Sequence, residues 1–263
     1  MNARGTQRGG MALNRCFSTL GCPELSLAAV LALAERHGIP GVELRSLEHH
    51  LDLAPYFAGV YGTPERLAQA VAGSGVRVMA LGTSLRLIGG TPAERAELVA
   101  LLPWADALGV RWLRAFDGGR DFGDGEQAAA AATVAWWREE RQARGGRADL
   151  MVETHDALLT SAAIDRFRST LPDVAILWDA HHTWRKGGED PVATWRAIRP
   201  AVVHVHVKDS IPVPSARHPF TYVLPGDGGF PAGALLAALA ADGFSGPVSL
   251  EWEKGWHPYL PPL

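Results

Sequence analysis

Short runs rich in valine, isoleucine and leucine alternate along the chain with longer segments rich in alanine and leucine. The short runs are apolar at successive positions, which is typical of parallel strands that are buried on both faces. The pattern predicts strands at Cys16–Leu20, Gly41–Arg45, Val76–Leu81, Arg111–Phe116, Leu150–Thr154, Val174–Asp179, Val202–Val207 and Val248–Trp252. The intervening segments predict helices at Leu27–His37, Thr63–Gly73, Pro92–Leu108, Gln127–Gln142, Ala157–Thr170, Pro191–Ile198 and Ala232–Ala241.

Eight strands that alternate with helices favour a closed α/β barrel, the single-domain (β/α)8 TIM barrel, which we place at residues 13–263. The alternative is a doubly wound open sheet, which would carry a glycine-rich phosphate turn after its first strand. The turn at Leu20–Pro23 contains no such motif, so the barrel is the better prediction. Residues 1–12, which are polar and rich in arginine and glycine, are predicted to be a disordered leader.

Composition narrows the possible partners. The formal net charge is −3, which gives no electrostatic reason to expect nucleic acid. No apolar run is long enough to span a bilayer, and no apolar segment follows the charged start as in a secretory signal. The only cysteines, Cys16 and Cys22, form neither a redox motif nor a zinc knuckle. We therefore predict a cytoplasmic protein that binds a small molecule and neither a membrane nor nucleic acid; homo-oligomerisation is compatible with the sequence.

Four consecutive predicted strands end in a carboxylate or an imidazole. They are the last four strands, and the residues are Glu153, Asp179, His206 and Glu251. Polar residues at the carboxyl ends of barrel strands point into the active site. Three carboxylates gathered there would repel one another unless a cation compensated them. The sequence therefore predicts one divalent metal ion; oxygen-rich ligation favours Mn²⁺, Mg²⁺ or Co²⁺, and Zn²⁺ also fits.

The two-residue period of a strand selects among neighbouring candidates. His204, His206 and Lys208 share one face of their strand, and His206 lies nearer the carboxyl end. We therefore assign His206 to the metal, place His204 one layer deeper and expect Lys208 to contact the substrate. Glu251 and Glu253 also share a face, and Glu251 is preferred because it directly follows the apolar run.

Five short motifs together resemble one known family. They are GVELR at Gly41–Arg45, ETH at Glu153–His155, WDAHH at Trp178–His182, HVHVKD at His204–Asp209 and SLEWE at Ser249–Glu253. In this order and spacing they resemble the xylose-isomerase-like superfamily of sugar-phosphate isomerases and epimerases. The resemblance covers the chain from about Leu13 to Trp252.

The resemblance implies roles for individual residues. In ketose 3-epimerases of that superfamily, residues that correspond to the four proposed ligands hold the metal, and the two that match Glu153 and Glu251 exchange the proton beside the carbonyl. The histidine that matches His182 contacts the substrate. Those enzymes carry an arginine where this chain has Pro212, and Arg217 is the candidate to replace it.

Three further features have two interpretations each. His155 either lines the pocket or lies in an exposed loop. Glu43 and Arg45 either pair with each other or touch the substrate. The sequence Pro225–Gly229 reads PGDGG, which is either a plain turn, the favoured interpretation, or a phosphate-binding loop at the place where barrels often bind phosphate.

The hypothesis that best unites these residues is a metal-dependent isomerase or epimerase of a small sugar or sugar derivative, with Glu153 and Glu251 as the proton-transferring pair. A related dehydratase would begin with the same proton abstraction. One alternative is a phosphodiesterase of the endonuclease IV type, which needs further histidine ligands on the second and third strands. Another is a barrel that binds a ligand without catalysis.

Overall fold

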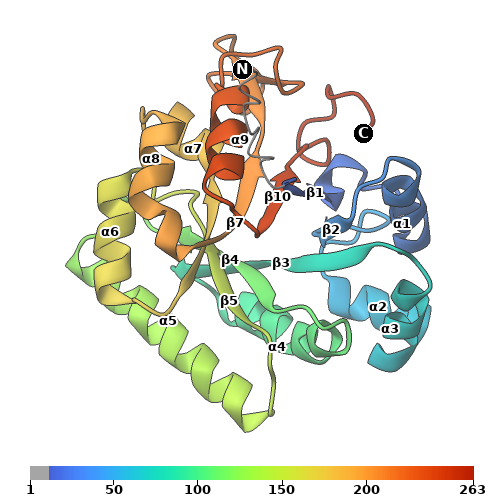
Figure 1. The fold of residues 1–263 in the computed structure, drawn as a ribbon. Helices are drawn as coiled ribbons and strands as arrows, with labels where there is room; N and C mark the ends of the chain where they lie inside the picture. Colours follow the sequence, from blue (N-terminus) through green and yellow to red (C-terminus); the bar gives the residue numbers. More distant parts are fainter. Residues whose placement is uncertain (1–11) are drawn as a thin grey trace, which may run out of the picture.

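The computed structural model describes residues 12–263, so the predicted leader lies outside the described residues except for its last position. Eight parallel strands close into a barrel, and the helices surround it (Figure 1). In the order in which they are paired, the barrel strands are β1 (Asn14–Ser18), β10 (Pro247–Leu250), β7 (Val202–Val207), β6 (Ala175–Asp179), β5 (Asp149–Glu153), β4 (Trp112–Gly118), β3 (Arg77–Ile88) and β2 (Gly41–Leu44). The predicted fold is therefore confirmed.

The helices connect successive strands, as the alternating pattern predicts. They are α1 (Leu27–Arg36), α2 (Leu53–Tyr61), α3 (Pro64–Ala72), α4 (Pro92–Ala107), α5 (Asp124–Ala143), α6 (Ser161–Thr170), α7 (Ala180–Arg185), α8 (Pro191–Ile198) and α9 (Ala232–Ala241). Thr91 and Glu94 form a reciprocal capping box at the start of α4, so the Thr-Pro signal there marks a true helix start. No described helix is long and apolar enough to cross a membrane.

Three elements were missed by the sequence patterns. Helix α2 is short and carries Pro55 in its first turn, where proline costs little. Helix α7 begins directly at the end of β6, because the Asp179 side chain caps it by accepting a hydrogen bond from the His182 N–H at 2.8 Å. A two-stranded antiparallel hairpin, β8 (Asp209–Ile211) and β9 (Thr221–Val223), extends beyond β7. Helix α6 begins at Ser161 rather than Ala157, because the Thr160 side chain caps it.

The barrel separates two apolar regions. The main core lies between the strands and the helices, where Trp178 stacks on Trp195 with ring centroids 6.2 Å apart. A small apolar plug fills the inside of the barrel and consists of Ala80, Met151, Ala175 and Leu177. Above the plug, toward the carboxyl ends of the strands, the inward positions become polar. The apolar floor thus supports a polar chamber at one end of the barrel.

Strand register sets which polar residues are neighbours in that chamber. Asp179 on β6 pairs with His206 on β7, and His206 pairs with Ser249 on β10. Since side chains alternate along each strand, these three all point inward at the same level. Glu251 follows Ser249 by two residues and therefore points inward one level higher. Register alone brings the last four barrel strands' polar ends together.

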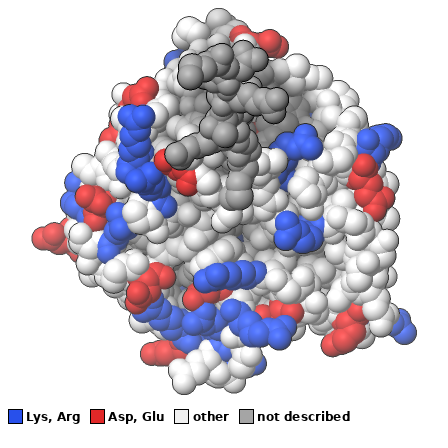
Figure 2. Space-filling model, viewed as in Figure 1, with Lys and Arg blue, Asp and Glu red and all other residues white. Residues whose placement is uncertain are grey.

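The outer surface carries charge of both signs. Figure 2 shows lysine and arginine interspersed with aspartate and glutamate on the face that it presents. This mixture agrees with the net charge of −3.

Candidate metal centre and active site

Four buried side chains meet at the carboxyl ends of neighbouring strands. Glu153 is the last residue of β5, Asp179 the last of β6, His206 lies on β7 and Glu251 directly follows β10. Each offers one ligand atom, and these atoms all lie within 4.8 Å of one another. All four residues are at most 5% exposed. The structure thus brings together the complete set that the strand ends predicted.

The donor atoms of this cluster fit a bound cation. Glu153 Oε2, Asp179 Oδ2 and His206 Nδ1 are buried and make no hydrogen bond among the described residues. His206 Nδ1 lies 3.2 Å from Glu251 Oε2 and 3.7 Å from Glu153 Oε1. Buried polar atoms without hydrogen bonds are rare and need an explanation. Arg114 and Lys208 lie beside the first two of these atoms, and a divalent ion that accepts lone pairs from three carboxylates and one imidazole would satisfy the whole set, including His206 Nδ1.

His206 is oriented from below by Glu43. Its Nε2 lies 2.8 Å from Glu43 Oε2, which also accepts a hydrogen bond from Ser249 Oγ at 3.2 Å. His204 Nε2 lies 3.3 Å from the same oxygen. Because Nε2 is engaged by a carboxylate, Nδ1 is left to face the ligand cluster, an arrangement typical of metal-binding histidines.

This position corrects the predicted role of Glu43. Its side chain is 1% exposed and does not line the pocket, so it supports His206 and is not placed to touch a substrate. It also forms no ion pair with Arg45 among the described residues, whereas Arg45 does line the pocket, so its contact with a substrate stays a prediction. The cause is the closure of the barrel, which sets Glu43 against a strand end that lies far along the chain.

The charges of the cluster shift the pKa values of its members. Burial alone would lower the pKa of His206, but the carboxylates of Glu251 and Glu43 outweigh it and raise that pKa well above the usual value. Burial would raise the pKa of Glu251, but His206 and Lys208 hold it well below the usual value. Burial raises the pKa of Asp179 to about 6, despite the nearby ammonium of Lys208. Glu251 is therefore ionised at neutral pH.

Lys208 joins the cluster instead of standing free at the mouth of the pocket. Its Nζ lies 2.8 Å from Asp179 Oδ2, 2.5 Å from Glu251 Oε2 and 2.5 Å from Glu253 Oε1. It also lines the pocket, so a substrate contact stays a prediction. The ammonium neutralises carboxylates that would otherwise repel one another. Glu253, which the sequence analysis did not choose as a metal ligand, thus belongs to the cluster as an ion-pair partner of Lys208.

A pocket of about 330 Å³ opens above the cluster. Its volume lies in the range of small-molecule sites. Of the predicted substrate contacts, it is lined by His155, His182, Lys208 and Arg217. His155 therefore lines the pocket, as one of its two interpretations held. Arg217 is exposed and approaches from the loop between β8 and β9, with its guanidinium 5.9 Å from the Trp256 ring.

His182 presents one nitrogen to this pocket. Its Nδ1 lies 3.1 Å from the carbonyl oxygen of Thr154, which can only accept, so Nδ1 carries the proton. Burial, reinforced by the charge of Lys208, holds its pKa well below the usual value, so the ring is neutral. Its ring packs edge-on against His155, with centroids 4.8 Å apart. Nε2 is then able to accept a hydrogen bond from a hydroxyl group of a ligand.

Arg114 is among the pocket residues that the sequence reasoning missed. It lies on β4, is 1% exposed and places Nε 3.2 Å from Glu153 Oε2. Its guanidinium stacks 3.9 Å above the ring of Phe116. The signal was available, because an arginine inside an otherwise apolar barrel strand has no other favourable place than the pocket.

Two other aspartates near strand ends, Asp209 and Asp117, bind backbone N–H groups and do not belong to the ligand cluster. The Asp209 carboxylate accepts hydrogen bonds from the backbone N–H groups of Ser210, Gly226, Gly228 and Phe230, at 2.7–3.0 Å. Three of these donors belong to or directly follow the PGDGG segment. Because an internal carboxylate already binds them, this segment is a turn, as favoured, and its amides are not free for phosphate.

Asp117 at the end of β4 behaves in the same way. It accepts hydrogen bonds from the backbone N–H groups of Gly118, His155, Asp156 and Leu158. It also lies in a second acidic group with His155 and Asp156. Its lone pairs are therefore used to hold the loop that carries His155, and this group is not a metal site.

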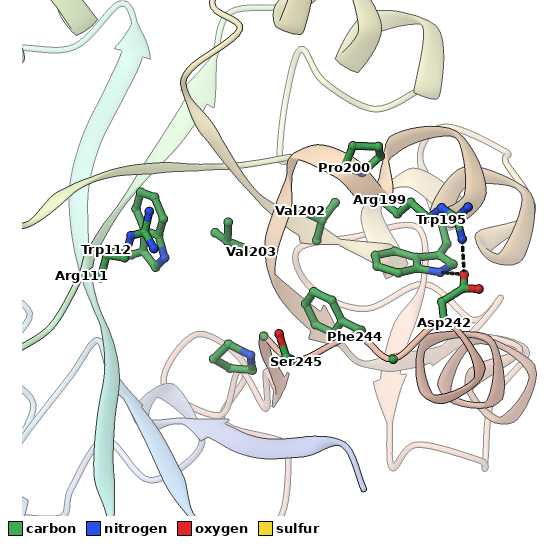
Figure 3. Close-up of a pocket in the computed structure, with 13 residues that line it drawn as sticks. Arg111, Trp112, Trp195, Arg199, Pro200, Val202, Val203, Asp242, Phe244 and Ser245 are labelled. Carbon is green, nitrogen blue, oxygen red and sulfur yellow. Dashed lines mark hydrogen bonds and ion pairs between the residues drawn. The ribbon is translucent and has the colours of Figure 1, made fainter. Parts of the chain in front are cut away.

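A larger pocket of about 590 Å³ lies at the opposite, amino-terminal end of the strands (Figure 3). It is lined by the first residues of β4, β7 and β10 and by Arg199 and Trp195. The only carboxylate drawn there is Asp242, which binds Trp195 Nε1 at 2.8 Å and Arg199 Nη1 at 2.9 Å. Catalytic groups of barrel enzymes lie at the carboxyl ends instead. The smaller pocket is therefore the candidate active site.

Comparison with known proteins agrees with this geometry. The family model described as xylose isomerase-like TIM barrel matches residues 31–262. No curated protein matches the sequence. Among solved structures, the chain is similar to the probable 3-DHS dehydratase AsbF from Bacillus anthracis, which is involved in petrobactin synthesis. The TM-score is 0.73 at 18% identity, over 92% of this chain and 93% of that one.

Two further structures have the same fold. The IolI protein, solved with a zinc atom, has a TM-score of 0.72 at 18% identity, over 92% of this chain and 89% of that one. The 3-keto-D-glucoside 4-epimerase YcjR from E. coli has a TM-score of 0.69 at 14% identity, over 91% and 92% of the two chains. At these identities the likenesses show the fold. The match of the family model to residues 31–262 shows that the chain belongs to the xylose isomerase-like TIM barrel family.

Proposed function

We propose that this protein is a metal-dependent isomerase or epimerase that acts on a small sugar or sugar derivative. The observation that carries the proposal is the convergence of Glu153, Asp179, His206 and Glu251 at the base of a pocket of about 330 Å³. Paired carboxylates beside a metal site are suited to remove and return a proton next to a carbonyl group.

The two glutamates are placed to work as a pair. In the strand order of the barrel, Glu153 and Glu251 stand on either side of Asp179 and His206. A substrate over the cluster is thus approached by one carboxylate from each side. If one glutamate removes a proton and the other returns it to the opposite face, the carbon is epimerised. If a single group returns the proton to the neighbouring carbon, the result is aldose–ketose isomerisation.

The remaining residues of the site bind the metal or the substrate, or orient the side chains that do. Asp179 and His206 complete the ligand set, and Glu43 holds the His206 ring so that Nδ1 faces the carboxylates. His182 offers Nε2 to a substrate hydroxyl, and Lys208 keeps the carboxylates of Asp179 and Glu251 close together. A divalent ion bound there would polarise the substrate carbonyl and stabilise the enediolate charge. The donors favour Mn²⁺, Mg²⁺ or Co²⁺, and the zinc atom in the IolI structure supports Zn²⁺ as a further candidate.

Related activities begin with the same step. AsbF is described as a probable dehydratase and YcjR as an epimerase, so dehydration after proton abstraction is the nearest variant of this proposal. The phosphodiesterase alternative would need histidine ligands on the second and third strands, and neither β2 nor β3 contains a histidine. The geometry therefore gives it no support.

The experiment is a deuterium-exchange assay in D₂O with the purified protein and Mn²⁺. D-fructose, D-fructose 6-phosphate and a cyclic hydroxy-keto acid serve as candidate substrates, and NMR detects deuterium at the carbon beside the carbonyl. Glu251→Gln should lose exchange by about 10²–10⁴-fold at saturating Mn²⁺, because an amide cannot take a proton. His182→Ala should keep the metal and mainly weaken substrate binding.

Metal content gives an independent measurement. Protein purified without chelator should carry about one divalent ion per chain by elemental analysis. Two or three zinc ions per chain would favour the phosphodiesterase instead. Full activity of Glu251→Gln at saturating Mn²⁺ would show that the glutamate is only a ligand. Metal binding without exchange on any substrate would favour the non-catalytic barrel.

A further inference from the structure

One wall of the pocket, next to the carboxylates, is built from a row of three residues on adjacent strands. Arg114 on β4 pairs in register with Gly82 on β3. Leu44 on β2 pairs with Leu81 on β3, so Arg45 follows at the level of Gly82. All three positions point inward, and both arginines line the pocket. Two guanidinium groups therefore lie side by side across β2, β3 and β4.

Gly82 makes this pairing possible. A Cβ atom at this position would lie 2.6 Å from Arg45 Cδ and 3.1 Å from Arg114 Nη2. Both distances are too short for an ordinary contact, so any larger residue would push the arginine side chains apart. The glycine leaves a trough across which both side chains extend.

Arg45 is a buried cation without a carboxylate partner. It is 4% exposed, and it donates only to neutral acceptors, the Leu51 carbonyl at 3.1 Å and Ser84 Oγ at 3.2 Å. Among the described residues no carboxylate forms an ion pair with it. The nearest compensation is indirect, since Glu97 binds the backbone N–H of Ser84 at 3.1 Å. Burial, together with the charge of Arg114, lowers the pKa of Arg45 to about 10.

Arg114 also has unused donors. Its Nη1 donates to the Thr83 carbonyl at 3.0 Å and its Nε forms an ion pair with Glu153 Oε2 at 3.2 Å, whereas no described residue accepts a hydrogen bond from Nη2. A guanidinium has five N–H donors in a planar fork that matches two oxygens of one acidic group. Buried charges in proteins are normally paired, because leaving them unpaired is costly. Arg114 is paired with Glu153, but the adjacent Arg45 has no ion-paired carboxylate among the described residues, and an acidic group of a ligand can supply that counter-charge.

We propose that the substrate carries an acidic group, a carboxylate or a phosphate, which binds between Arg45 and Arg114 while its carbonyl end faces Glu153 and Glu251. The pocket is thus divided into a cationic half on β2–β4 and a metal and acid–base half on β5–β7 and β10. A neutral sugar would leave the cationic half uncompensated. This inference rests on the proposed function for the position of the reacting carbons, but the anion site itself can be tested without turnover.

The test is a ligand-observed NMR titration with three small probes. Cyclohexanecarboxylate and cyclohexylmethanol match in shape and differ in charge, and inorganic phosphate represents the second type of acidic group. Each is titrated against the Mg²⁺-loaded and the metal-free protein. We expect the carboxylate or phosphate to bind at least about tenfold more tightly than the alcohol in both forms. The anion that binds more tightly indicates which acidic group the substrate carries.

Arginine variants test whether the preference for anions arises from Arg45 and Arg114. Arg45→Met and Arg114→Met should each weaken anion binding by about tenfold or more and leave alcohol binding unchanged. Arg111→Met is the matched control, because Arg111 lies at the amino-terminal end, stacked on Trp112. If the methionine variants do not fold, two milder variants replace them. Arg45→Lys keeps the positive charge but loses the planar guanidinium, and Gly82→Ala keeps Arg45 but displaces its side chain. Both should weaken anion binding.

Two outcomes would overturn the proposal. The wild-type protein could bind the alcohol as tightly as the anions, or the preference for anions could persist when either arginine is replaced. An anion preference that depends on Arg45 and Arg114 in metal-free protein would support the site even if the deuterium-exchange assay found no activity. Exchange without any anion preference would support the proposed function and reject this inference.

Discussion

Buried aspartates at the carboxyl ends of the strands fall into two groups that differ in their partners. Asp117 and Asp209 each accept hydrogen bonds from four backbone N–H groups. Asp179 accepts one backbone N–H as a helix cap, and its Oδ2 faces Lys208 and the other carboxylates. All three residues are at most 1% exposed. Burial and position at a strand end are therefore common to both groups.

The difference teaches which acidic groups are available for chemistry. A carboxylate whose lone pairs all accept from the backbone is part of the loop scaffold, because moving it would leave several buried donors unpaired. A carboxylate that meets only side-chain cations and other carboxylates can exchange those partners for a metal ion or a proton. The comparison predicts that Asp179 can be neutralised with a loss of function, whereas Asp209 can be neutralised only with a loss of stability.

The largest effect is expected for Asp179→Asn. Affinity for Mn²⁺ should fall by at least about a hundredfold, and deuterium exchange should fall with it, because an anionic ligand becomes neutral. The free energy of unfolding of the metal-free variant should change by less than about 1 kcal/mol, since asparagine still caps α7 and the buried Lys208 keeps Glu251 and Glu253 as partners. Calorimetric titration and urea unfolding measure the two quantities. A large loss of stability would break the distinction between the two groups.

Asp209→Asn is expected to give the opposite result. The free energy of unfolding should fall by about 2–4 kcal/mol, because an amide group brings N–H donors toward four backbone donors. The Mn²⁺ affinity of the folded variant should stay within about twofold of the wild-type value. Urea unfolding of the metal-free protein checks the first statement and calorimetry the second. A variant as stable as the wild type would show that these hydrogen bonds do not hold the turn.

A smaller effect is expected where a side chain would intrude on the same turn. A Cβ atom at Gly228 would lie 2.2 Å from Asp209 Oδ1 and 2.6 Å from the Ser210 carbonyl oxygen. Gly228→Ala should therefore cost about 2 kcal/mol of unfolding free energy. Gly125→Ala is the control, because nothing lies within 4 Å of its Cβ position in the first turn of α5. The control should be neutral or up to about 1 kcal/mol more stable.

The mildest prediction concerns pH. Burial raises the pKa of Asp179 to about 6, so below that pH the carboxyl holds a proton that a metal ion must displace. Because the raised pKa of His206 keeps a proton on that ligand as well, Mn²⁺ affinity should fall by about tenfold per pH unit above pH 6 and more steeply below it, where the Asp179 proton is displaced too. Titrations between pH 5 and 8 measure the slope. The step near pH 6 should disappear in Asp179→Asn, and an affinity independent of pH would contradict the assignment.

Much of the candidate site could be predicted because strand periodicity is local. The two-residue period placed His204, His206 and Lys208 on one face, and the structure shows all three pointing inward. The barrel rule for strand ends then selected Glu153 and Asp179. The structure brings the proposed ligands together, while their roles in binding and catalysis stay predictions.

What could not be predicted depends on contacts between distant segments. Glu43 meets His206 although 163 residues separate them in the chain. Arg45 and Arg114 lie side by side only because the register sets Gly82 between them. No local pattern distinguishes Asp209, which the backbone surrounds, from Asp179, which it leaves free for side-chain partners.

By itself, the sequence determined the alternation of strands and helices, the shared face of alternate strand residues and the carboxylate or imidazole at the ends of the last four barrel strands. These properties follow from periodicity and composition within a few residues. Only the tertiary structure decided which inward residues meet, which carboxylates the loops enclose and where the two arginines form a cationic wall. Barrel closure and strand register make those choices, because both depend on the packing of the whole chain.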